Sequence, residues 1–329
     1  MKTKIFSLLL IVTLLLSFAA CAAPEDKPDV KIYTLNGTTG FGMAKLMSDA
    51  KTDEAFSHYK FEVKEDASDV TAAMISGDAD IAALPTNAAA NLYNKTQGKV
   101  KILAVNTLGC LYLLTNQNAS VNGFSDLKGK TVYAPAQNPT FIFKYLCEQN
   151  GLTVGKDVKI DSTSYAAPAA LKDAVAAGKV DVAVLPEPMV TVASAAAKKA
   201  GTATLTVAMD LTEEWNRVSE KDSLVQGCVV VRTEFLEAHP EAVKQFLSAY
   251  KESIEYLGTD LEKASQMIAD CGIFANAAVA KTAIPKCNVR YVDGEAMKAS
   301  MKTYLNVLHG INPAAVGGAL PADDFYYIP

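Results

Sequence analysis

The stretch AMISGDADIAALP at residues 73–85 is repeated, without a gap, as AVAAGKVDVAVLP at residues 174–186. In each copy a helical segment ends at a glycine, Gly77 or Gly178, the residue that most readily adopts the left-handed conformation at a helix C-terminus. An aspartate and a four-residue apolar run follow, and a proline stops the run, as expected for a buried parallel strand. The repeat therefore predicts two copies of a helix-turn-strand unit.

Short apolar strands alternate with helical segments along most of the chain, a pattern typical of βαβ units and mainly parallel sheets. The predicted strands are 31–35, 59–63, 81–84, 101–105, 131–134, 158–162, 182–185 and 204–208. After the apolar run at 228–231 the pattern changes to long helical stretches at 240–257, 261–271, 279–284 and 295–308. The sequence thus predicts an α/β fold with a helical C-terminal part.

The chain has 329 residues, and one hydrophobic core seldom grows beyond about 250 to 300 residues, so we expect two lobes. The segment SDLKGK at 125–130 precedes a predicted strand and indicates the opening of the second lobe. We predict a discontinuous first lobe, a second lobe inserted into it, and two hinge crossovers between them. The boundaries are 30–116 plus 226–329 for lobe one, 119–222 for lobe two, and hinges near 117–118 and 223–225.

The N-terminal segment has the pattern of a secretion signal. Lys2 and Lys4 precede the apolar stretch 5–16, which is shorter than the roughly 20 residues of a transmembrane helix, and small residues then precede Cys21. This arrangement resembles the lipobox of bacterial lipoproteins, although Phe18 stands where Leu is commoner. The resemblance implies a signal peptide at 1–21 with lipidation of Cys21, and an ordinary cleaved signal is the alternative. Residues 22–29, with two prolines and four charges, are expected to form a tether.

Composition and motifs argue against several classes of function. The net charge of −5 and the absence of a Lys/Arg-rich run exclude the usual nucleic-acid-binding pattern. His58, His239 and His309 form no His-Glu-x-x-His motif, and the chain has no Gly-x-Ser-x-Gly elbow. The cysteines after Cys21 are odd in number and form no Cys-x-x-Cys pair, although a bridge between Cys271 and Cys287 stays open. We therefore expect no metal, no cofactor and no catalysis.

The repeat, the DLKGK segment at 126–130, the LPEP segment at 185–188 and the discontinuous first lobe together resemble type II periplasmic binding proteins. Within these, the chain is similar to the branch of nitrate, taurine, alkanesulfonate and thiamine-pyrimidine precursor binders. The resemblance implies a two-lobed clamp, each lobe a mainly parallel sheet flanked by helices, which binds a small molecule between the lobes. It further implies a monomeric, extracytoplasmic lipoprotein, anchored to the cell membrane, that delivers its ligand to an ABC permease driven by a cytoplasmic ATPase.

Ligands of open α/β sheets bind beyond the carboxyl ends of the strands, where helices begin. The strand 31–35 is followed by a glycine-rich loop with two hydroxyls, which suits a ligand but also fits a plain strand-to-helix turn. The ends of the two repeats carry polar residues, which suit a ligand but also fit helix capping. The residues predicted to bind ligand are Asn36, Gly37, Thr38, Thr39, Gly40, Thr86, Asn87, Thr107, Pro139, Thr140, Phe141, Glu187 and Gln226.

Three aspects of the ligand site follow from the residue types. Glu187 suits a cationic or amine-bearing group, or merely the positive end of its helix. Arg and Lys are scarce in these loops, which favours a neutral or zwitterionic compound over a bare inorganic anion. Tyr112, Phe141 and Trp215 suit stacking on a heterocycle, or the core. We expect a small organic molecule of the heterocycle, sulfonate or amine class.

Two other classes of function stay open. The same fold serves a pyrimidine-precursor synthase, which uses a dense cysteine cluster, whereas no two cysteines are adjacent here. A ligand-sensing lipoprotein is the second alternative, and such a sensor normally carries a transmembrane helix or a signalling module, which no segment after residue 20 resembles.

Overall fold

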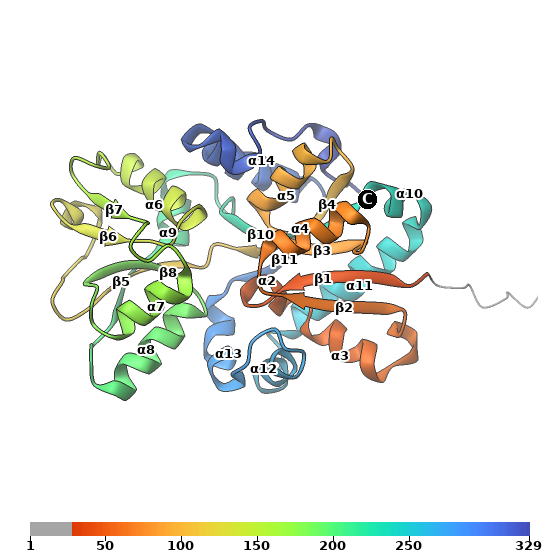
Figure 1. Ribbon diagram of the computed structural model, residues 1–329, viewed down its shortest axis with the longest axis horizontal. Helices are drawn as coiled ribbons and strands as arrows, with labels where there is room; N and C mark the ends of the chain where they lie inside the picture. Colours follow the sequence, from red (N-terminus) through yellow and green to blue (C-terminus); the bar gives the residue numbers. More distant parts are fainter. Residues whose placement is uncertain (1–27) are drawn as a thin grey trace, which may run out of the picture.

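The computed structural model describes residues 28–329, which form two α/β lobes side by side along the long axis of the molecule (Figure 1). The predicted signal peptide, Cys21 and most of the predicted tether lie outside the described residues. Among the described residues, no helix is both long and apolar enough to cross a membrane. The two lobes correspond to the two sheets, each covered by helices on both faces.

Lobe one is built on a six-stranded sheet with the order β11-β4-β10-β3-β1-β2. Alternate residues of each strand face opposite sides, as the two-residue period of a strand requires. Ile32 of β1 faces a core formed with α3, α11, α12 and α13, whereas Leu35 faces a core formed with α4, α5 and α14. The elements of this lobe are β1 (Val30–Leu35), α2 (Thr38–Phe41), α3 (Ala44–Thr52), β2 (Tyr59–Lys64), α4 (Ala67–Ser76), β3 (Ile81–Pro85), α5 (Thr86–Lys95), β4 (Val100–Leu108), β10 (Val225–Arg232), α10 (Thr233–Ala238), α11 (Pro240–Tyr256), α12 (Leu261–Asp270), α13 (Ala277–Ala283), β11 (Val289–Val292) and α14 (Gly294–Ile311).

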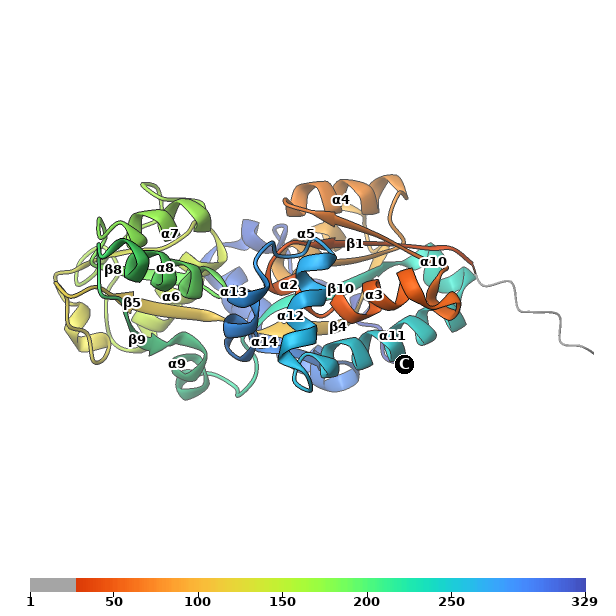
Figure 2. The same cartoon turned by 90° about the horizontal axis from the view of Figure 1, so that it is seen from below.

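Lobe two is built on a five-stranded sheet with the order β7-β6-β8-β5-β9. Helices α7 and α8 cover one face, and α6 and α9 cover the other, below and above the sheet in Figure 1. Figure 2 shows the two lobes side by side from below. Its elements are β5 (Leu111–Thr115), β6 (Thr131–Tyr133), α6 (Asn138–Gln149), β7 (Lys159–Asp161), α7 (Pro168–Ala176), β8 (Val182–Pro186), α8 (Met189–Ala200), β9 (Thr206–Asp210) and α9 (Leu211–Val218).

The α/β architecture is as predicted, and most strands of each sheet run in one direction, although antiparallel strands among them make the pairing mixed. In lobe one, β1 pairs in parallel with β2 and β3, but β10 is antiparallel to β3 and β4, and β11 is antiparallel to β4. In lobe two, β6 is parallel to β7 and β8, but β5 is antiparallel to β8 and β9. The reversed strands are β10 and β11 in lobe one and β5 in lobe two, and of these β5 and β10 enter their sheets directly after the chain crosses from the other lobe.

The first crossover lies at Gly109 and Cys110, so the predicted hinge at 117–118 and the predicted end of lobe one at 116 are wrong. Leu111–Thr115 already pairs with β8 and β9 of the second sheet. The chain returns between α9 and β10, and Val225 at the start of β10 pairs with Leu108. A Cβ atom on Gly109 would lie 2.6 Å from a methyl carbon of Leu224, so the two crossovers pack tightly against each other.

An aromatic cluster continues the core across the crossovers. Trp215 of α9 is fully buried, and its ring centroid lies 4.9 Å from that of Tyr145 in α6 and 5.9 Å from that of Tyr304 in α14. Its indole N–H donates to Ser223 in the return crossover at 2.8 Å. Trp215 is therefore a core residue and not a ligand platform, and α14 packs on both lobes.

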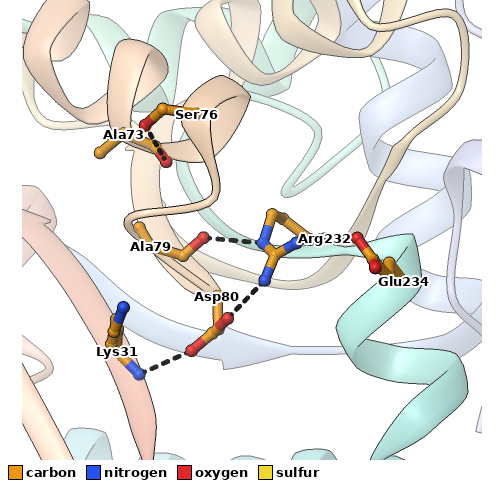
Figure 3. Close-up of polar contacts among 7 residues, drawn as sticks. All are labelled: Lys31, Ala73, Ser76, Ala79, Asp80, Arg232 and Glu234. Atoms are coloured by element: carbon orange, nitrogen blue, oxygen red, sulfur yellow. Dashed lines mark hydrogen bonds and ion pairs between the residues drawn. The ribbon is translucent and has the colours of Figure 1, made fainter.

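The repeated glycines and aspartates have parallel structural roles. Gly77 and Gly178 both have positive φ, of 84° and 70°. Asp80 accepts hydrogen bonds from the backbone nitrogen of Lys31 at 2.9 Å and from Arg232 Nη2 at 2.7 Å, which ties β1, β3 and β10 together (Figure 3). Its counterpart, Asp181, accepts from Asn116 Nδ2 at 2.7 Å. Each repeat aspartate thus joins its strand to neighbouring elements of its own sheet, at the end opposite to Pro85 or Pro186.

Candidate functional site

Four loops meet where the carboxyl ends of strands in one lobe face those in the other. Thr38 Oγ1, after β1, donates to the backbone oxygen of Glu187, after β8, at 2.8 Å. Asn138 Nδ2, after β6, donates to Asn87 Oδ1, after β3, at 2.7 Å. Because β1 neighbours β3 and β6 neighbours β8, and adjacent strands lie about 5 Å apart, the two contacts belong to one region. We call this region the inter-lobe site. It consists of Thr38, Asn87, Asn138 and Glu187, together with Tyr112 and Lys286, whose contacts are described below.

The glycine-rich loop places Thr38 at this site. Gly37 has a φ of 76°, and a Cβ atom on Gly40 would lie 2.1 Å from the backbone oxygen of Leu35, so both positions depend on glycine. Thr38 is 9% exposed, and its hydroxyl also lies 3.8 Å from Cys287 Sγ. Thr39 is only half-buried and its side chain makes no hydrogen bond to the described residues, while Asn36 is exposed. Of this loop, Thr38 is the residue that contacts the other lobe through its side chain.

Glu187 brings a buried carboxylate to the same place. Its side chain is fully buried, Oε1 accepts from Thr191 Oγ1 at 3.0 Å, and Oε2 accepts from the Thr191 backbone nitrogen at 3.1 Å. Lys286 Nζ of lobe one lies 4.0 Å from Oε1. Burial raises the pKa of Glu187, and the hydrogen bonds from Thr191 and the charge of Lys286 oppose that rise. A carboxylate in this setting favours a positively charged or hydrogen-bond-donating group as its neighbour.

Lys286, which the sequence did not suggest as a site residue, comes from a short 3-10 helix, η3 (Ile284–Lys286), after α13. Tyr112 of β5 donates its hydroxyl proton to the backbone oxygen of Lys286 at 2.9 Å. This is a third hydrogen bond between the lobes, next to the crossover at Cys110. Tyr112, named from the sequence as an aromatic of the pocket, thus acts here through its hydroxyl.

The helices α5 and α6 begin at the Asn87–Asn138 contact. Neither first turn has a side-chain cap, so the free N–H groups of both helices point toward this region. Such helix N-termini favour negatively charged groups. Asn138 Oδ1 is buried and has no hydrogen-bond partner among the described residues. The site therefore combines N–H donors near Asn87 with acceptors at Asn138 and Glu187.

The other predicted residues make their contacts within one lobe or at the crossovers. Thr86 donates to Val225 O at 2.7 Å, and Gln226 Oε1 accepts from the backbone nitrogen of Cys110 at 2.7 Å, which links the two crossovers. Thr107 Oγ1 lies 3.0 Å from Asn106 Oδ1 inside the first sheet. In α6, Pro139 lies at the helix start, Thr140 donates to Pro135 O at 2.8 Å, and Phe141 packs against the core.

Asn106 is a buried polar residue that the sequence did not indicate. Its Nδ2 donates to Tyr250 Oη at 2.9 Å and to Thr39 O at 3.3 Å, so it holds the glycine-rich loop from beneath. A polar residue inside an apolar strand, at the end nearest the crossover, is the signal that would have revealed it.

Arginines are absent from these contacts. The three arginines of the chain lie elsewhere: Arg217 pairs with Glu214 on α9, Arg232 pairs with Asp80, and Arg290 is exposed on β11. Within residues 28–329, no group of three or more His, Cys, Asp or Glu side chains is arranged to hold a metal ion. The five described cysteines are buried and free, so the bridge between Cys271 and Cys287 that the sequence left open is not formed.

Residues 54–279 match the family described as ABC transporter, phosphonate, periplasmic substrate-binding protein. The chain belongs to this family of ABC transporter substrate-binding proteins. The match confirms the resemblance inferred from the repeat and makes the protein the substrate-binding component of an ABC transporter. No curated protein matches the chain significantly.

Solved structures show the same fold across most of the chain. A crystal structure of an ABC transporter from Parabacteroides distasonis is 24% identical, with a TM-score of 0.74, and the match covers 92% of this chain and 99% of that one. The periplasmic aliphatic sulphonate binding protein of Escherichia coli is 15% identical, with a TM-score of 0.68 over 92% and 93% of the two chains. The periplasmic nitrate-binding protein of Synechocystis is 15% identical, with a TM-score of 0.53 over 75% of this chain and 66% of that one.

Proposed function

We propose that the protein is an extracytoplasmic, lipid-anchored binding protein that takes up a small organic molecule at the inter-lobe site and delivers it to an ABC permease. The observation that carries the proposal is the Thr38–Glu187 contact, which joins residues far apart in the chain at the facing ends of β1 and β8. The sequence around Cys21 supports the anchor, and family membership supports the permease as partner.

We further propose that the ligand carries an amine, and that an acidic head group accompanies it. The buried carboxylate of Glu187 suits the amine. The uncapped starts of α5 and α6, next to Asn87 and Asn138, suit the acidic group without any arginine. A bare inorganic anion would bring a second negative charge close to the buried carboxylate of Glu187, so it fits this arrangement less well.

Catalysis on the same fold is the second class of function, and the thiols argue against it. Burial raises the pKa of Cys110 to about 12, and burial also raises the pKa of Cys287. A thiol that stays protonated at neutral pH is a poor nucleophile. A purified protein that turns over a bound compound would contradict the proposal, as would a role in signalling that persists when uptake is abolished.

Screening by thermal shift tests the binding function directly. Compounds that carry both an amine and a sulfonate, phosphonate or carboxylate should raise the melting temperature of the mature protein, because a ligand that binds only the native state stabilises it. Solution scattering on the same samples should show a smaller radius of gyration with ligand, since the ligand touches both lobes. Confirmed binding with an unchanged scattering profile would contradict closure of the lobes.

Thr38→Val tests whether the glycine-rich loop contributes to ligand binding or is only a strand-to-helix turn. Valine has the shape of threonine but no hydroxyl, so the bond to Glu187 O is lost, and we expect ligand affinity to fall about tenfold, the equivalent of one hydrogen bond of about 1.4 kcal/mol. Thr52→Val is the matched control, because Thr52 is exposed on α3 and its hydroxyl bonds to Ser48 O of the same helix. Titration calorimetry of both variants measures the difference, and equal affinities would remove Thr38 from the site.

A further inference from the structure

Lys286 is paired with Glu187 in an unusual way. The carboxylate belongs to lobe two and is fully buried, whereas the lysine side chain belongs to lobe one and is 51% exposed. The ammonium thus reaches toward the carboxylate from the solvent side. The pair spans the two lobes and exists only while they are in contact.

The pair is too loose to be an important structural ion pair. Nζ and Oε1 are 4.0 Å apart, at the limit of an ion pair, and half-exposed pairs of this kind contribute about 0 to 1 kcal/mol. Asp80 and Arg232, by comparison, approach to 2.7 Å and are both largely buried. The Glu187 carboxylate accepts two hydrogen bonds, both from Thr191, and a carboxylate has about four acceptor positions. Glu187 therefore has room for a further donor.

We propose that the ammonium group of Lys286 occupies, in the absence of ligand, the position beside Glu187 that the ammonium group of the ligand takes on binding. This inference rests on the proposed function and extends it. While the lobes are in contact and no ligand is bound, the lysine ammonium neutralises Glu187; on binding, the ammonium of the ligand takes its place and the lysine side chain moves into solvent. The side chain can leave without moving its backbone, because Tyr112 holds the backbone oxygen of Lys286 and the four-carbon stem is flexible.

Competition with Lys286 makes the site selective for ligands that carry a positive charge. A ligand without a positive charge cannot replace Lys286 beside Glu187, so it gains nothing at this position. A ligand with an ammonium must displace the lysine, and its apparent affinity is lowered by the fraction of protein in which Lys286 occupies the position. Removal of the lysine should thus increase affinity for cations, whereas a lysine that itself bound an anionic ligand would have the opposite effect.

Chemical rescue of Lys286→Ala tests the proposal. Propylammonium corresponds to the part of the lysine side chain that the substitution removes. We expect it to bind Lys286→Ala about tenfold more tightly than the unmodified protein, as measured by thermal shift and calorimetry on the mature protein at low salt. The gain should disappear in the double variant Lys286→Ala/Glu187→Gln. Lys281→Ala is the matched control, because Lys281 lies nearby on α13 and pairs with Glu262, which is exposed.

Propylammonium that binds Lys286→Ala no better than the unmodified protein would overturn the proposal. A gain that survives Glu187→Gln, or that also occurs in Lys281→Ala, would overturn it as well. If Lys286→Ala folds poorly, Lys286→Met keeps the stem and should give the same tighter binding of an amine-bearing ligand from the screen. A ligand that closes the lobes but binds the lysine variants more weakly would refute the role of Lys286 and leave the proposed function intact.

Discussion

Replacing Glu187 by glutamine should weaken binding of an amine-bearing ligand by about 100-fold, equivalent to about 2.7 kcal/mol. The substitution keeps the shape of the side chain and an acceptor for Thr191, but it removes the buried negative charge that we propose to contact the ligand. Removing one partner of a buried charge pair commonly costs about 2 to 5 kcal/mol, much of it from the charge left unpaired. Calorimetric titration of both proteins with the same ligand measures the loss.

Glu213→Gln is the control for this prediction. Glu213 lies in the first turn of α9 and is exposed, so the same change in net charge should leave affinity within about twofold. Equal affinity of Glu187→Gln and the unmodified protein would mean that Glu187 only caps α8. Tighter binding of a simple anion by the variant, with no effect on amines, would show that the carboxylate repels the ligand and does not bind it.

The second large effect concerns stability. Asp80→Ala should lower the free energy of unfolding by about 3 kcal/mol, because it leaves the Lys31 N–H and the largely buried Arg232 without their carboxylate partner. Figure 3 shows this carboxylate between the two donors. Urea unfolding followed by circular dichroism measures the change, and ligand affinity of the folded variant should be unaltered because the contact lies at the far end of β3.

Asp181→Ala is the matched variant in the second copy of the repeat. Asp181 is exposed and accepts from the neutral amides of Asn116 and Asn118, so we expect a loss of about 1 kcal/mol or less. Equal losses in the two variants would show that the loss in free energy of unfolding depends on the position in the repeat and not on the buried guanidinium of Arg232. A loss below about 0.5 kcal/mol in Asp80→Ala would refute the structural role of the Arg232 pair.

The repeat and the apolar runs predicted most of the fold. All eight strands expected from the sequence are present, because each is a short apolar run bounded by turn residues. Strand β5 was missed because Leu111–Thr115 follows β4 after only two residues, so the two strands read as one stretch, and only the pairing with β8 and β9 separates them. Strand β11 was missed because four residues between two helices carry too little periodicity, and β10 was noted only as the apolar run at 228–231.

Some of the residues that meet between the lobes could be named from the sequence, and others could not. Thr38, Asn87 and Glu187 follow strands at their carboxyl ends, a position that can be derived from the order of elements alone. Lys286 follows a helix and has no local signal, and Tyr112 lies inside a strand, where its aromatic character alone suggested stacking and not the hydroxyl contact. Both reach the site only because the two lobes come together there, and contacts between distant segments depend on how the lobes pack.

The adjacency of the two crossovers has a topological consequence. β4 and β10 are antiparallel neighbours with Leu108 opposite Val225, so residues 109–224 form the connection of a single β-hairpin that has grown into a lobe. The entropy of closing such a connection increases only logarithmically with its length. Exchange of this insert for that of a related protein would therefore change half of the recognition surface at a small entropic cost, provided that the exchanged segment retains an aromatic partner for Tyr304.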